Sequence, residues 1–513
     1  MNQRFDVAII GNGPAGKLLS ILLAQQGLQV AVLDRFHTVY PLPRAIHFDD
    51  EVGRMLDQAG IGDAAKAICI YRNAPAEFLS GQGEVLIRLE SQSNPEHRWP
   101  QRNFFHQPQL EAIMQQRAAE LANIHFIGGV EAFAIEEKAD HAEVRFHELN
   151  DSSARSLQAR YVVGCDGANS FVKAHIGGGD TGLDFEHDWL VADFTRANAD
   201  AWPDAGRQYC RPERPTTYVP MGPTAFRMEF MLRPGERRED FESPAALYQM
   251  LRETGLPHEG LHIVRQAIYT FRARWRNQWR KGRVFIAGDA AHLTPPFLGQ
   301  GLCAGARDAV NLAWKLPLVL QGKASEQLLD SYASERIPHA QALIEGAVEY
   351  GHVICVRDPQ QARQRDADML SQGMRTLPSV PRPLLGPGVR SQGSALAGTL
   401  LPQFAVDNES RKPNLDRWLS GISLISQESS AAATEAAGPL GRQLGLTIIS
   451  AQDTAPKTQA ALLRWLQDNG CQHVLVRPDF YIYGSANSPA ELQALLQQLQ
   501  ADLGSTTAMD RAA

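Results

Sequence analysis

The chain has 513 residues, of which 21% are charged, and a net charge of −7. This length predicts two or three domains, the acidic balance disfavours nucleic acid as a partner, and no apolar run reaches the roughly 18 residues of a membrane span. The six cysteines show neither CxxC nor metal-ligand spacing, which indicates buried thiols in a reducing cytoplasm and no metal site. Because a strand-like run begins at Phe5, we expect no signal peptide.

The N-terminal stretch follows the order strand, glycine turn, helix, strand. Apolar residues 5–10 precede GNGPAG at 11–16, a helical pattern covers 15–26, and residues 28–33 form a second apolar strand. Asp34 then stands where a carboxylate can meet the ribose diol of a dinucleotide. The pattern predicts a dinucleotide-binding βαβ unit, and an acid at this place favours FAD or NAD over NADP.

The next segments supply further candidates. Arg44 stands between a loop and an amphipathic helix, where it either meets a phosphate or is simply solvated. Residues 125–149 alternate as a hairpin with its turn near 138–141. The short strand 161–163 ends in GCDGANS, so an acid and a glycine again follow a strand.

Residues 188–276 contain four strand-like runs and predict a sheet laid over the site. Three residues are candidates for packing against a substrate ring, with plain core positions as the alternative: Tyr218, Met228 and Phe230. Five arginines are candidates for a substrate carboxylate, with surface ion pairs as the alternative: Arg211, Arg214, Arg227, Arg272 and Arg274.

Residues 282–316 have the outline of a cofactor site. The strand 284–286 ends at Gly288-Asp289, a loop rich in Gly and Pro follows, and 304–316 has apolar residues at helical spacing. A helix N-terminus behind glycines attracts negative charge, although a strand-turn-helix that binds nothing shows much the same pattern. We expect the helix to stop or kink at Pro317.

The C-terminal part begins after residues 377–393, which are dense in Pro and Gly and predict a linker. Beyond it, strands and helices alternate, with helical stretches at 460–468 and 489–503. We expect residues 505–513 to be frayed.

Three motifs together resemble a known family. GNGPAG at 11–16, CDGANSFVK at 165–173 and GDAAHLTPPFLGQG at 288–301 have the order and spacing of the FAD fingerprints of the single-component aromatic hydroxylases, the group-A flavoprotein monooxygenases. PRAIHFDDE, FFHQPQLE and RPTTYVP look most like the branch of 3-(3-hydroxyphenyl)propionate hydroxylase and phenol hydroxylase.

The resemblance implies a mixed α/β (α+β) fold with three domains. A Rossmann-like FAD-binding domain at 1–180 and 277–376 is interleaved with a substrate-binding β-sheet domain at 181–276. After the linker at 377–393, residues 394–513 resemble a thioredoxin-like domain. Without CxxC this domain cannot perform dithiol chemistry, so we expect it to serve packing or the contacts of a homodimer.

The resemblance also implies the FAD contacts. The first glycines admit the pyrophosphate, Asp34 holds the adenosine ribose, and Asp289 binds a ribityl hydroxyl. Lys173 stands where the family more often has arginine, which loses the bidentate fork. The implied contacts are Gly11, Gly13, Pro14, Ala15, Gly16, Asp34, Arg35, Arg44, Gln107, Asp166, Gly167, Gly288, Asp289, Pro296, Gly299, Gln300, Gly301 and Leu302.

The resemblance also implies a residue beside the substrate. The carbonyl of Pro296 matches one that lies next to the reacting ring, and we place Tyr218, Arg227, Met228 and Phe230 on the substrate side. His292 belongs to the same motif as Pro296 and is a catalytic candidate, but a structural imidazole bonded to the backbone is the favoured interpretation.

The implied activity is that of an FAD-dependent aromatic-ring monooxygenase. NADH or NADPH reduces FAD, O2 adds at C4a to give a hydroperoxide, and this electrophile hydroxylates a phenolic ring. A phenylpropanoid-type phenolic acid is the favoured substrate. Alternatives are a polyketide or heteroaromatic phenol in biosynthesis, a flavin reductase, a halogenase, or a silent flavin-binding assembly protein. WRNQWRKG at 275–282 does not supply the WxWxIP segment of halogenases.

Overall fold

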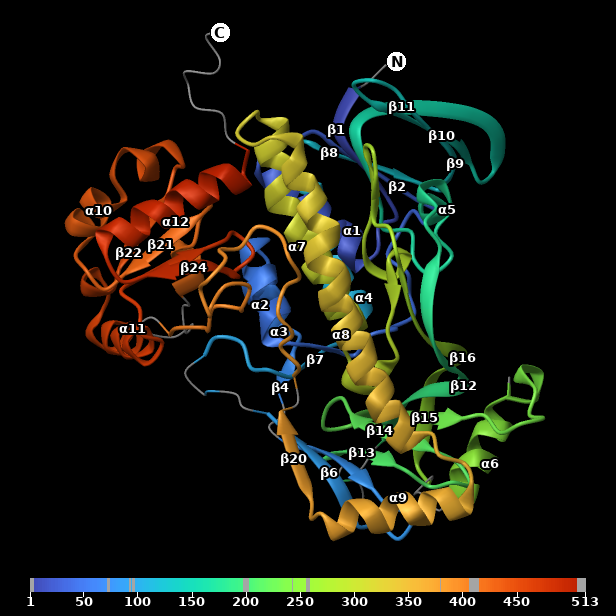
Figure 1. Ribbon diagram of the computed structural model, residues 1–513. Coiled ribbons are helices and arrows are strands. Elements are labelled where there is room, and N and C mark those ends of the chain that lie inside the picture. The colour runs from blue at the N-terminus through green and yellow to red at the C-terminus, as the bar shows by residue number, and fades with distance from the viewer. Residues whose placement is uncertain are drawn as a thin grey trace.

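The computed structural model describes residues 4–71, 74–91, 94, 97–196, 203–241, 243–254, 259–378, 380–405 and 415–504. Figure 1 shows an N-terminal α/β part, a large β-sheet beneath it, and a smaller C-terminal α/β part at its side. The predicted mixed α/β fold is confirmed. Residues 505–513, predicted to be frayed, lie outside the described residues.

The first sheet is built around β1 (Arg4–Ile10), which lies parallel between β2 (Val30–Asp34) and β11 (Asp151–Gly164). β8 (Ile124–Gly128) pairs with β2, and β18 (Val284–Ile286) pairs with β11. All of these neighbours are parallel, which brings their carboxyl ends to one edge of the sheet. The three glycine motifs follow β1, β11 and β18, and so they meet at this edge.

An antiparallel hairpin extends this sheet. β9 (Val130–Glu137) pairs with β10 (Ala142–Glu148), and β10 pairs with β11. The amide of Lys138 donates to the carbonyl of His141 at 2.7 Å and closes the turn. The predicted hairpin and its turn are therefore confirmed. On the other edge, β17 (Arg280–Lys281) pairs with β18.

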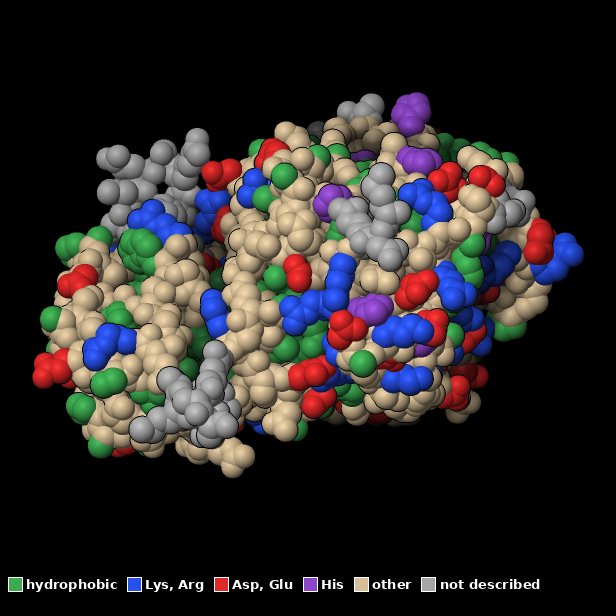
Figure 2. Space-filling model, turned by 90° about the horizontal axis from the view of Figure 1, so that it is seen from above, with side chains coloured by type: hydrophobic (Ala, Val, Ile, Leu, Met, Phe, Trp, Pro, Cys, Tyr) green, Lys and Arg blue, Asp and Glu red, His purple; other side chains and the backbone are tan. Residues whose placement is uncertain are grey.

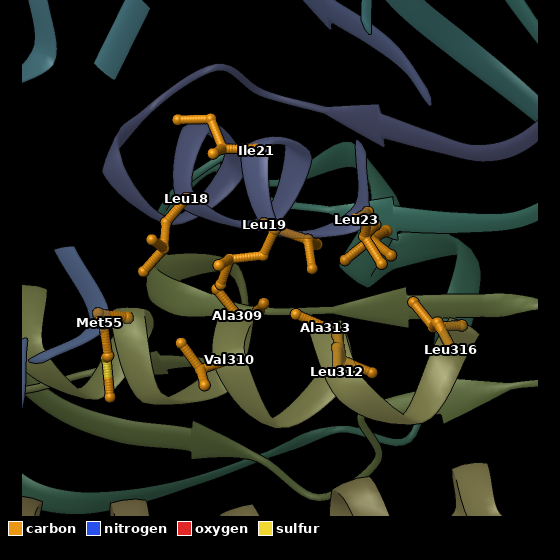
Figure 3. Packing of buried hydrophobic residues seen from close by; sticks show 14 of the residues in the cluster. Leu18, Leu19, Ile21, Leu23, Met55, Ala309, Val310, Leu312, Ala313 and Leu316 are labelled. Atoms are coloured by element: carbon orange, nitrogen blue, oxygen red, sulfur yellow. The ribbon is translucent and has the colours of Figure 1, made fainter. Parts of the chain in front are cut away.

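Two helices pack against each other behind the glycine motifs, α1 (Pro14–Gln25) and α7 (Gly301–Leu320). Figure 3 shows leucines of α1 facing small and branched side chains of α7. The buried residues of this contact include Leu18, Leu19, Leu23, Ala309, Val310, Leu312 and Ala313. Small side chains let the helix axes approach closely, which holds the two N-termini beside the same edge of the sheet.

Of the two outcomes predicted at Pro317, a stop or a kink of the helix, the stop is wrong. α7 continues to Leu320 with Pro317 inside it, and the amide of Gln321 donates to the carbonyl of Pro317 at 2.9 Å. Proline lacks the N–H of one helical hydrogen bond. Because Pro317 lies in the last turn, the helix loses this one bond near its end and still completes its final turn.

The second sheet has nine strands in the order β19-β16-β12-β15-β14-β13-β5-β6-β20. Its centre is the long antiparallel pair of β12 (Asp180–Arg196) and β16 (Leu261–Arg276). The other strands are β5 (Ala76–Leu79), β6 (Val85–Glu90), β13 (Gly206–Tyr209), β14 (Thr216–Pro220), β15 (Ala225–Met231), β19 (His292–Leu293) and β20 (Arg375–Pro378). The sheet thus includes strands from outside the segment 181–276. These strands were not predicted, because pairing between distant segments leaves no local sequence pattern.

The second sheet has two different faces. α6 (Pro244–Thr254) covers one of them, where Leu247 and Leu251 belong to a buried apolar cluster with Phe226, Met228 and Phe230. The other face is turned toward the glycine motifs and carries polar side chains. The sheet is therefore an apolar floor on one side and a polar wall on the other.

The remaining elements surround these two sheets. A small antiparallel sheet joins β3 (His47–Phe48), β4 (Ile70–Tyr71) and β7 (Asn103–Phe104). The other helices of this part are α2 (Asp50–Gln58), α3 (Gly62–Ala67), α4 (Gln107–Ala119), α5 (Phe171–Ile176), α8 (Asp330–Ile354) and α9 (Pro359–Ser371). Short 3₁₀ helices at Gly288–Ala290 and Pro296–Leu298 carry the third glycine motif.

The C-terminal part is a four-stranded sheet in the order β22-β21-β23-β24, with β21 parallel to β22 and antiparallel to β23. Its elements are β21 (Ser423–Ser426), α10 (Ser430–Gln443), β22 (Thr447–Ser450), α11 (Pro456–Asp468), β23 (His473–Val476), β24 (Ile482–Ala486) and α12 (Pro489–Asp502). The predicted helices at 460–468 and 489–503 are confirmed within one to four residues at their ends. The thioredoxin-like assignment stays a prediction.

The segment predicted as a linker, 377–393, packs closely on α8 in its described residues. Leu385 and Val389 are buried. The amide of Gly386 donates to the carbonyl of Glu335 at 3.0 Å, and the amide of Val389 donates to the Glu335 carboxylate at 2.7 Å. The Pro and Gly residues of this segment allow its backbone to pass close to α8.

A buried ion network joins the C-terminal part to α7 and α8. Arg477 donates two hydrogen bonds to Glu335 at 2.9 and 2.8 Å, two to Asp479 at 3.0 and 2.6 Å, and one to the Val389 carbonyl at 2.9 Å. Lys315 on α7 donates to the same Glu335 carboxylate at 2.7 Å. All of these charged side chains are buried. The C-terminal part is therefore tied to the N-terminal part by charges that have no water around them.

The surface shows no single dominant charge on the face seen in Figure 2, where acidic and basic side chains lie intermixed. Many exposed charges form ion pairs, such as Arg272 with Glu186 at 3.0 Å. Within the described part of the chain, every helix is too short or too polar to cross a membrane.

Candidate active site

A cavity of about 400 Å³ lies between the three glycine motifs and the polar face of the second sheet. Strand ends and helix N-termini form one wall, and β13, β14 and β15 form the other. Many of the predicted cofactor residues line it: Gly13, Pro14, Ala15, Arg44, Gln107, Gly167, Gly288, Asp289, Pro296, Gly299, Gly301 and Leu302.

The N-termini of α1 and α7 both open into this cavity. The cap residues Gly13 and Gln300 make no side-chain cap hydrogen bond, so the first amides of each helix are left for another acceptor. A Cβ built on Gly13 or Gly301 would meet no atom within 4 Å. Open space in front of two uncapped helix starts is suited to a phosphate group or to another anionic group.

Gly11 and Gly16 serve the first motif in a different way. Gly11 has φ 101°, and a Cβ there would lie 2.4 Å from the carbonyl oxygen of Cys165 in the second motif. A Cβ on Gly16 would lie 2.1 Å from the carbonyl oxygen of Gly11. These glycines do not line the cavity; they let the first and second motifs touch through their backbones.

Asp34 holds the same glycine turn. One carboxylate oxygen accepts from the amide of Asn12 at 2.5 Å and the other from the amide of Phe36 at 2.8 Å. Each oxygen keeps a lone pair for a ribose hydroxyl. Arg35 is exposed and pairs with Glu131, and neither Asp34 nor Arg35 lines the cavity.

Gln107 fixes the backbone of Arg44. Its carbonyl oxygen accepts from the amides of Arg44 and Ala45 at 2.8 and 2.7 Å, and its amide nitrogen donates to Glu111 at 2.8 Å. The carbonyl of Arg44 accepts from Arg227 at 2.7 Å. The Arg44 segment is thus held between α4 and the second sheet, while its exposed side chain stays available to an anion.

The second motif is organised by Asp166. Its carboxylate accepts from the amides of Phe171 and Val172 at 2.7 and 3.2 Å, at the start of α5. Burial raises the pKa of this carboxyl. Lys173 donates to the carbonyl of Ala168, which closes the loop around Gly167. Gly167 lines the cavity, whereas Asp166 and Lys173 shape the loop from behind.

The third motif is fixed by Asp308 on α7. Its carboxylate accepts from the amide of Gly288 at 2.9 Å, meets the Nε2 atom of His292 at 2.7 Å, and accepts from Arg336 at 2.9 Å. Burial opposes the charged form, but His292 and Arg336 still lower the pKa of Asp308. His292 is buried and does not line the cavity. This geometry favours a structural role for the His292 imidazole. Its partner is the Asp308 carboxylate, whereas the sequence analysis favoured a backbone group.

Asp289 and the loop after it face the cavity. The Asp289 side chain is exposed to the cavity, and the surrounding protein desolvates it and raises its pKa. Pro296 begins a 3₁₀ turn that ends at Gly299 with φ 65°. Gln300, a predicted cofactor contact, is fully buried, accepts from Arg307 at 3.0 Å and does not line the cavity.

His47 is a residue that sequence reasoning missed. It lines the cavity, and a Cβ on Gly299 would lie 2.9 Å from its Nδ1 atom. Its Nε2 atom is buried without a hydrogen bond to any described residue. Burial, and then the charge of Arg102, lower the pKa of His47 to about 4. Its only sequence signal was its place in PRAIHFDDE, which was used for the resemblance alone.

The substrate-side candidates divide by the alternation of β15. Arg227 lines the cavity, whereas Met228 and Phe230 lie in the apolar cluster under α6. Tyr218 borders the cavity but belongs to the same cluster, and its hydroxyl donates to the carbonyl of Pro203 at 3.0 Å. Successive side chains of a strand point to opposite faces. Glu229, and not Met228 or Phe230, therefore shares the cavity face with Arg227.

Several polar residues of the wall were therefore missed: Arg102, Arg207, Gln208, Thr217 and Glu229. The other arginines considered for a substrate carboxylate form part of the protein's own contacts. Arg214 binds Glu236 at 2.6 Å, and Arg272 and Arg274 pair with Glu186. Arg211 does not line the cavity and packs over the ring of Tyr209.

These observations fit FAD as the group bound at the motifs. Two uncapped helix starts suit a pyrophosphate, Asp34 keeps acceptors for a ribose, and Asp289 offers an acceptor to a ribityl hydroxyl. The backbone at Gly301 and Leu302 forms the part of the cavity nearest to the start of α7. Helix amides there are suited to the negative charge that a flavin carries when reduced.

Comparison with known proteins agrees with this site. Residues 4–347 match the FAD binding domain family. The chain is 36% identical over 514 residues to a "Probable NADH-specific resorcinol 4-hydroxylase" of Rhodococcus jostii, covering 97% of this chain and 94% of the relative. It is 34% identical over 383 residues to a "3-(3-hydroxy-phenyl)propionate/3-hydroxycinnamic acid hydroxylase" of Escherichia coli, covering 74% and 68%.

The fold is similar to the solved structure of the flavin-dependent monooxygenase PieE in complex with FAD and substrate. The TM-score is 0.83 at 20% identity, and the match covers 98% of this chain and 99% of the other. The expected family is thereby confirmed. By its family match, its near full-length relative and its three motifs around one cavity, the chain belongs to the FAD-dependent aromatic hydroxylases.

Proposed function

We propose that this hydroxylase acts on a small neutral dihydroxybenzene of the resorcinol type and takes its electrons from NADH. The observation that carries the proposal is the cavity that joins the flavin motifs to the polar wall of the second sheet, in which Glu229 lies beside the uncharged side chains of Thr217 and Gln208. Its volume of about 400 Å³ is at the lower end of the range for ligand pockets, roughly 300–1,000 Å³. Because the flavin ring shares this space, one aromatic ring fits better than a polycyclic substrate.

The name of the near full-length relative supports the same choice of substrate and of NADH. FAD, when bound, supplies electron transfer from the nicotinamide and the activation of O2 for transfer of one oxygen atom to the ring. The protein must hold the ring at the flavin and keep water away. Phe297 and Leu298 contribute apolar surface at this point of the cavity, and Pro296 lies beside them.

His47 is suited to move a proton of the substrate. With a pKa of about 4 it is neutral near pH 7, and it lines the cavity beside Gly299. A neutral imidazole nitrogen can accept the proton of a phenolic hydroxyl. The resulting phenolate is richer in electrons at the ring carbons that are attacked. We therefore assign His47 as the base, and Pro296 as a residue that positions the ring.

A phenolic acid of the 3-(3-hydroxyphenyl)propionate type is the second candidate. Arg102 and Arg207 lie in the cavity wall, and the Nε atom of Arg207 lies 3.9 Å from the Glu77 carboxylate. Burial lowers the pKa of Arg102 to about 10, so it is still charged near pH 7. These guanidinium groups are suited to a carboxylate. The name of the Escherichia coli relative agrees with this candidate.

One assay separates the two. The purified holoprotein is mixed with NADH or NADPH in air, with resorcinol, with 3-(3-hydroxyphenyl)propionate, or without a phenol. We expect NADH oxidation that depends on resorcinol and a benzenetriol that carries one atom from ¹⁸O2. Turnover of the phenolic acid alone would favour the second candidate. Oxidation without hydroxylated product would contradict both.

We also propose a cytoplasmic location, a homodimer and a thioredoxin-like C-terminal domain. All six cysteines are unpaired, which agrees with a reducing compartment. The order β-α-β-α-β-β-α of the C-terminal part supports the domain assignment. Size-exclusion chromatography with light scattering tests the dimer.

A further inference from the structure

Three polar side chains form a row across the cavity face of the second sheet. Glu229 on β15 lies directly opposite Thr217 on β14, and Thr217 lies opposite Gln208 on β13. All three line the cavity and are otherwise buried. Residues paired across neighbouring strands share one face of a sheet, so the row presents its polar groups together to whatever the cavity holds.

The hydrogen bonds within this row are incomplete. The hydroxyl of Thr217 donates to the side-chain carbonyl of Gln208 at 2.6 Å. This fixes the orientation of Gln208, whose amide nitrogen is left as a donor, and Thr217 keeps acceptor lone pairs. The Glu229 carboxylate makes no hydrogen bond or ion pair with any described residue. A buried carboxylate without a partner is costly, so a donor from outside the chain is needed to satisfy it.

The neighbouring acid on the same sheet shows the contrast. Asp193 accepts two hydrogen bonds from Arg227 at 2.6 and 2.9 Å, and Arg265 lies 3.6 Å from it. The remaining amine of Arg227 donates to the carbonyl of Arg44. Three of the five N–H groups of Arg227 are therefore donated to Asp193 and Arg44, and none is donated to Glu229 two residues away. Burial raises the pKa of Glu229 to about 7, which the charge of Arg227 offsets only in part.

We propose that Glu229, together with Thr217 and Gln208, is the subsite that receives the second hydroxyl group of a dihydroxylated ring. A phenolic hydroxyl donates to the carboxylate and can accept from the amide of Gln208. A substrate carboxylate brings no donor and is repelled by Glu229. The subsite selects a neutral diphenol over a phenolic acid. This inference rests on the proposed function and names the group that sets its specificity.

The test compares Glu229→Gln with the matched control Glu186→Gln, whose side chain is exposed on β12 of the same sheet. The substrates are resorcinol, phenol and 3-(3-hydroxyphenyl)propionate, each assayed for kcat/KM with the holoenzyme. Loss of a hydrogen bond to a charged group predicts a kcat/KM for resorcinol that is lower by about 10- to 100-fold. We expect the value for phenol to change by less than about threefold, since phenol has no second hydroxyl to lose.

In Glu229→Gln, the kcat/KM for the phenolic acid should rise relative to that for resorcinol, and the FAD content should equal that of the wild type. The control variant Glu186→Gln should have wild-type kcat/KM values. A direct binding measurement accompanies the kinetics, in which resorcinol is titrated into the holoenzyme without NADH and the flavin absorbance is followed. Thr217→Val is the second variant, should Glu229→Gln not fold. It should lower the kcat/KM for resorcinol more than that for phenol.

The outcomes separate this inference from the proposed function. Equal losses for all three phenols, or an unchanged kcat/KM for resorcinol in a wild type that hydroxylates it, would overturn the subsite alone. A wild type that neither binds nor hydroxylates resorcinol would overturn the proposed function and the subsite together.

Discussion

Replacement of Arg477 by methionine tests whether the two halves of the molecule unfold together. Methionine keeps most of the length of the side chain and removes its charge. The change deletes five hydrogen bonds, two to Glu335, two to Asp479 and one to the Val389 carbonyl. Removal of one partner of a buried ion pair costs about 3–5 kcal/mol. Glu335 keeps Lys315 at 2.7 Å, so we expect a loss near the lower end of this range.

The measurement is urea unfolding of the holoprotein, followed in parallel by far-UV circular dichroism and by flavin fluorescence. We expect both signals to shift to lower urea by the same amount, because Glu335 lies on α8 of the flavin half. Arg417→Met is the matched control, since Arg417 is exposed in the same C-terminal part and, among the described residues, packs over the Trp418 ring. A loss below about 1 kcal/mol, or a shift in circular dichroism without one in flavin fluorescence, would refute the reasoning.

Three further predictions concern the motifs and the ion network. Gly11→Ala places a Cβ against backbone at a residue with φ 101°, so we expect FAD binding at least about tenfold weaker by equilibrium dialysis. The control Gly83→Ala, at φ 90° but in open space, should bind FAD normally. Despite burial, Arg477 lowers the pKa of Glu335 to about 2. Because this pKa is lower in the folded protein than in the unfolded chain, the ion pair stabilises the fold above about pH 4.5 and loses this effect as the pH falls toward 2. Arg477→Met should therefore flatten the pH dependence of the unfolding midpoint. Pro296→Gly should uncouple the enzyme, seen as more peroxide per NADH consumed, and unchanged coupling would contradict its place beside the substrate.

The cofactor half could be predicted because its signals are local. A short apolar strand, glycines and a helix follow one another within one stretch of chain at 5–25 and at 284–320. Parallel pairing then brings these stretches to one edge whatever lies between them. The roles within a motif were less accessible. Gly11 and Gly13 look alike in sequence, yet one packs on backbone and the other faces open space.

The substrate wall could not be predicted to the same degree. Glu229 becomes important only because β14 and β13 place Thr217 and Gln208 beside it, and β13 itself pairs with β5 from far earlier in the chain. Such pairings leave no local periodicity. The alternation of β15 still held the relevant signal, since Arg227 and Glu229 share the face that Met228 avoids.

The ion network has a consequence for the order of events in the cell. Glu335 and Lys315 belong to the flavin half and neutralise each other, whereas Arg477 and Asp479 form a second ion pair that is synthesised near the end of the chain. While the ribosome is still making the C-terminal part, Glu335 on α8 lacks the two hydrogen bonds that Arg477 donates in the finished protein. The contact between the two halves is therefore completed only after Arg477 has been synthesised. For the same reason, an exchange of C-terminal parts between related enzymes would need to carry the matching residues of both helices.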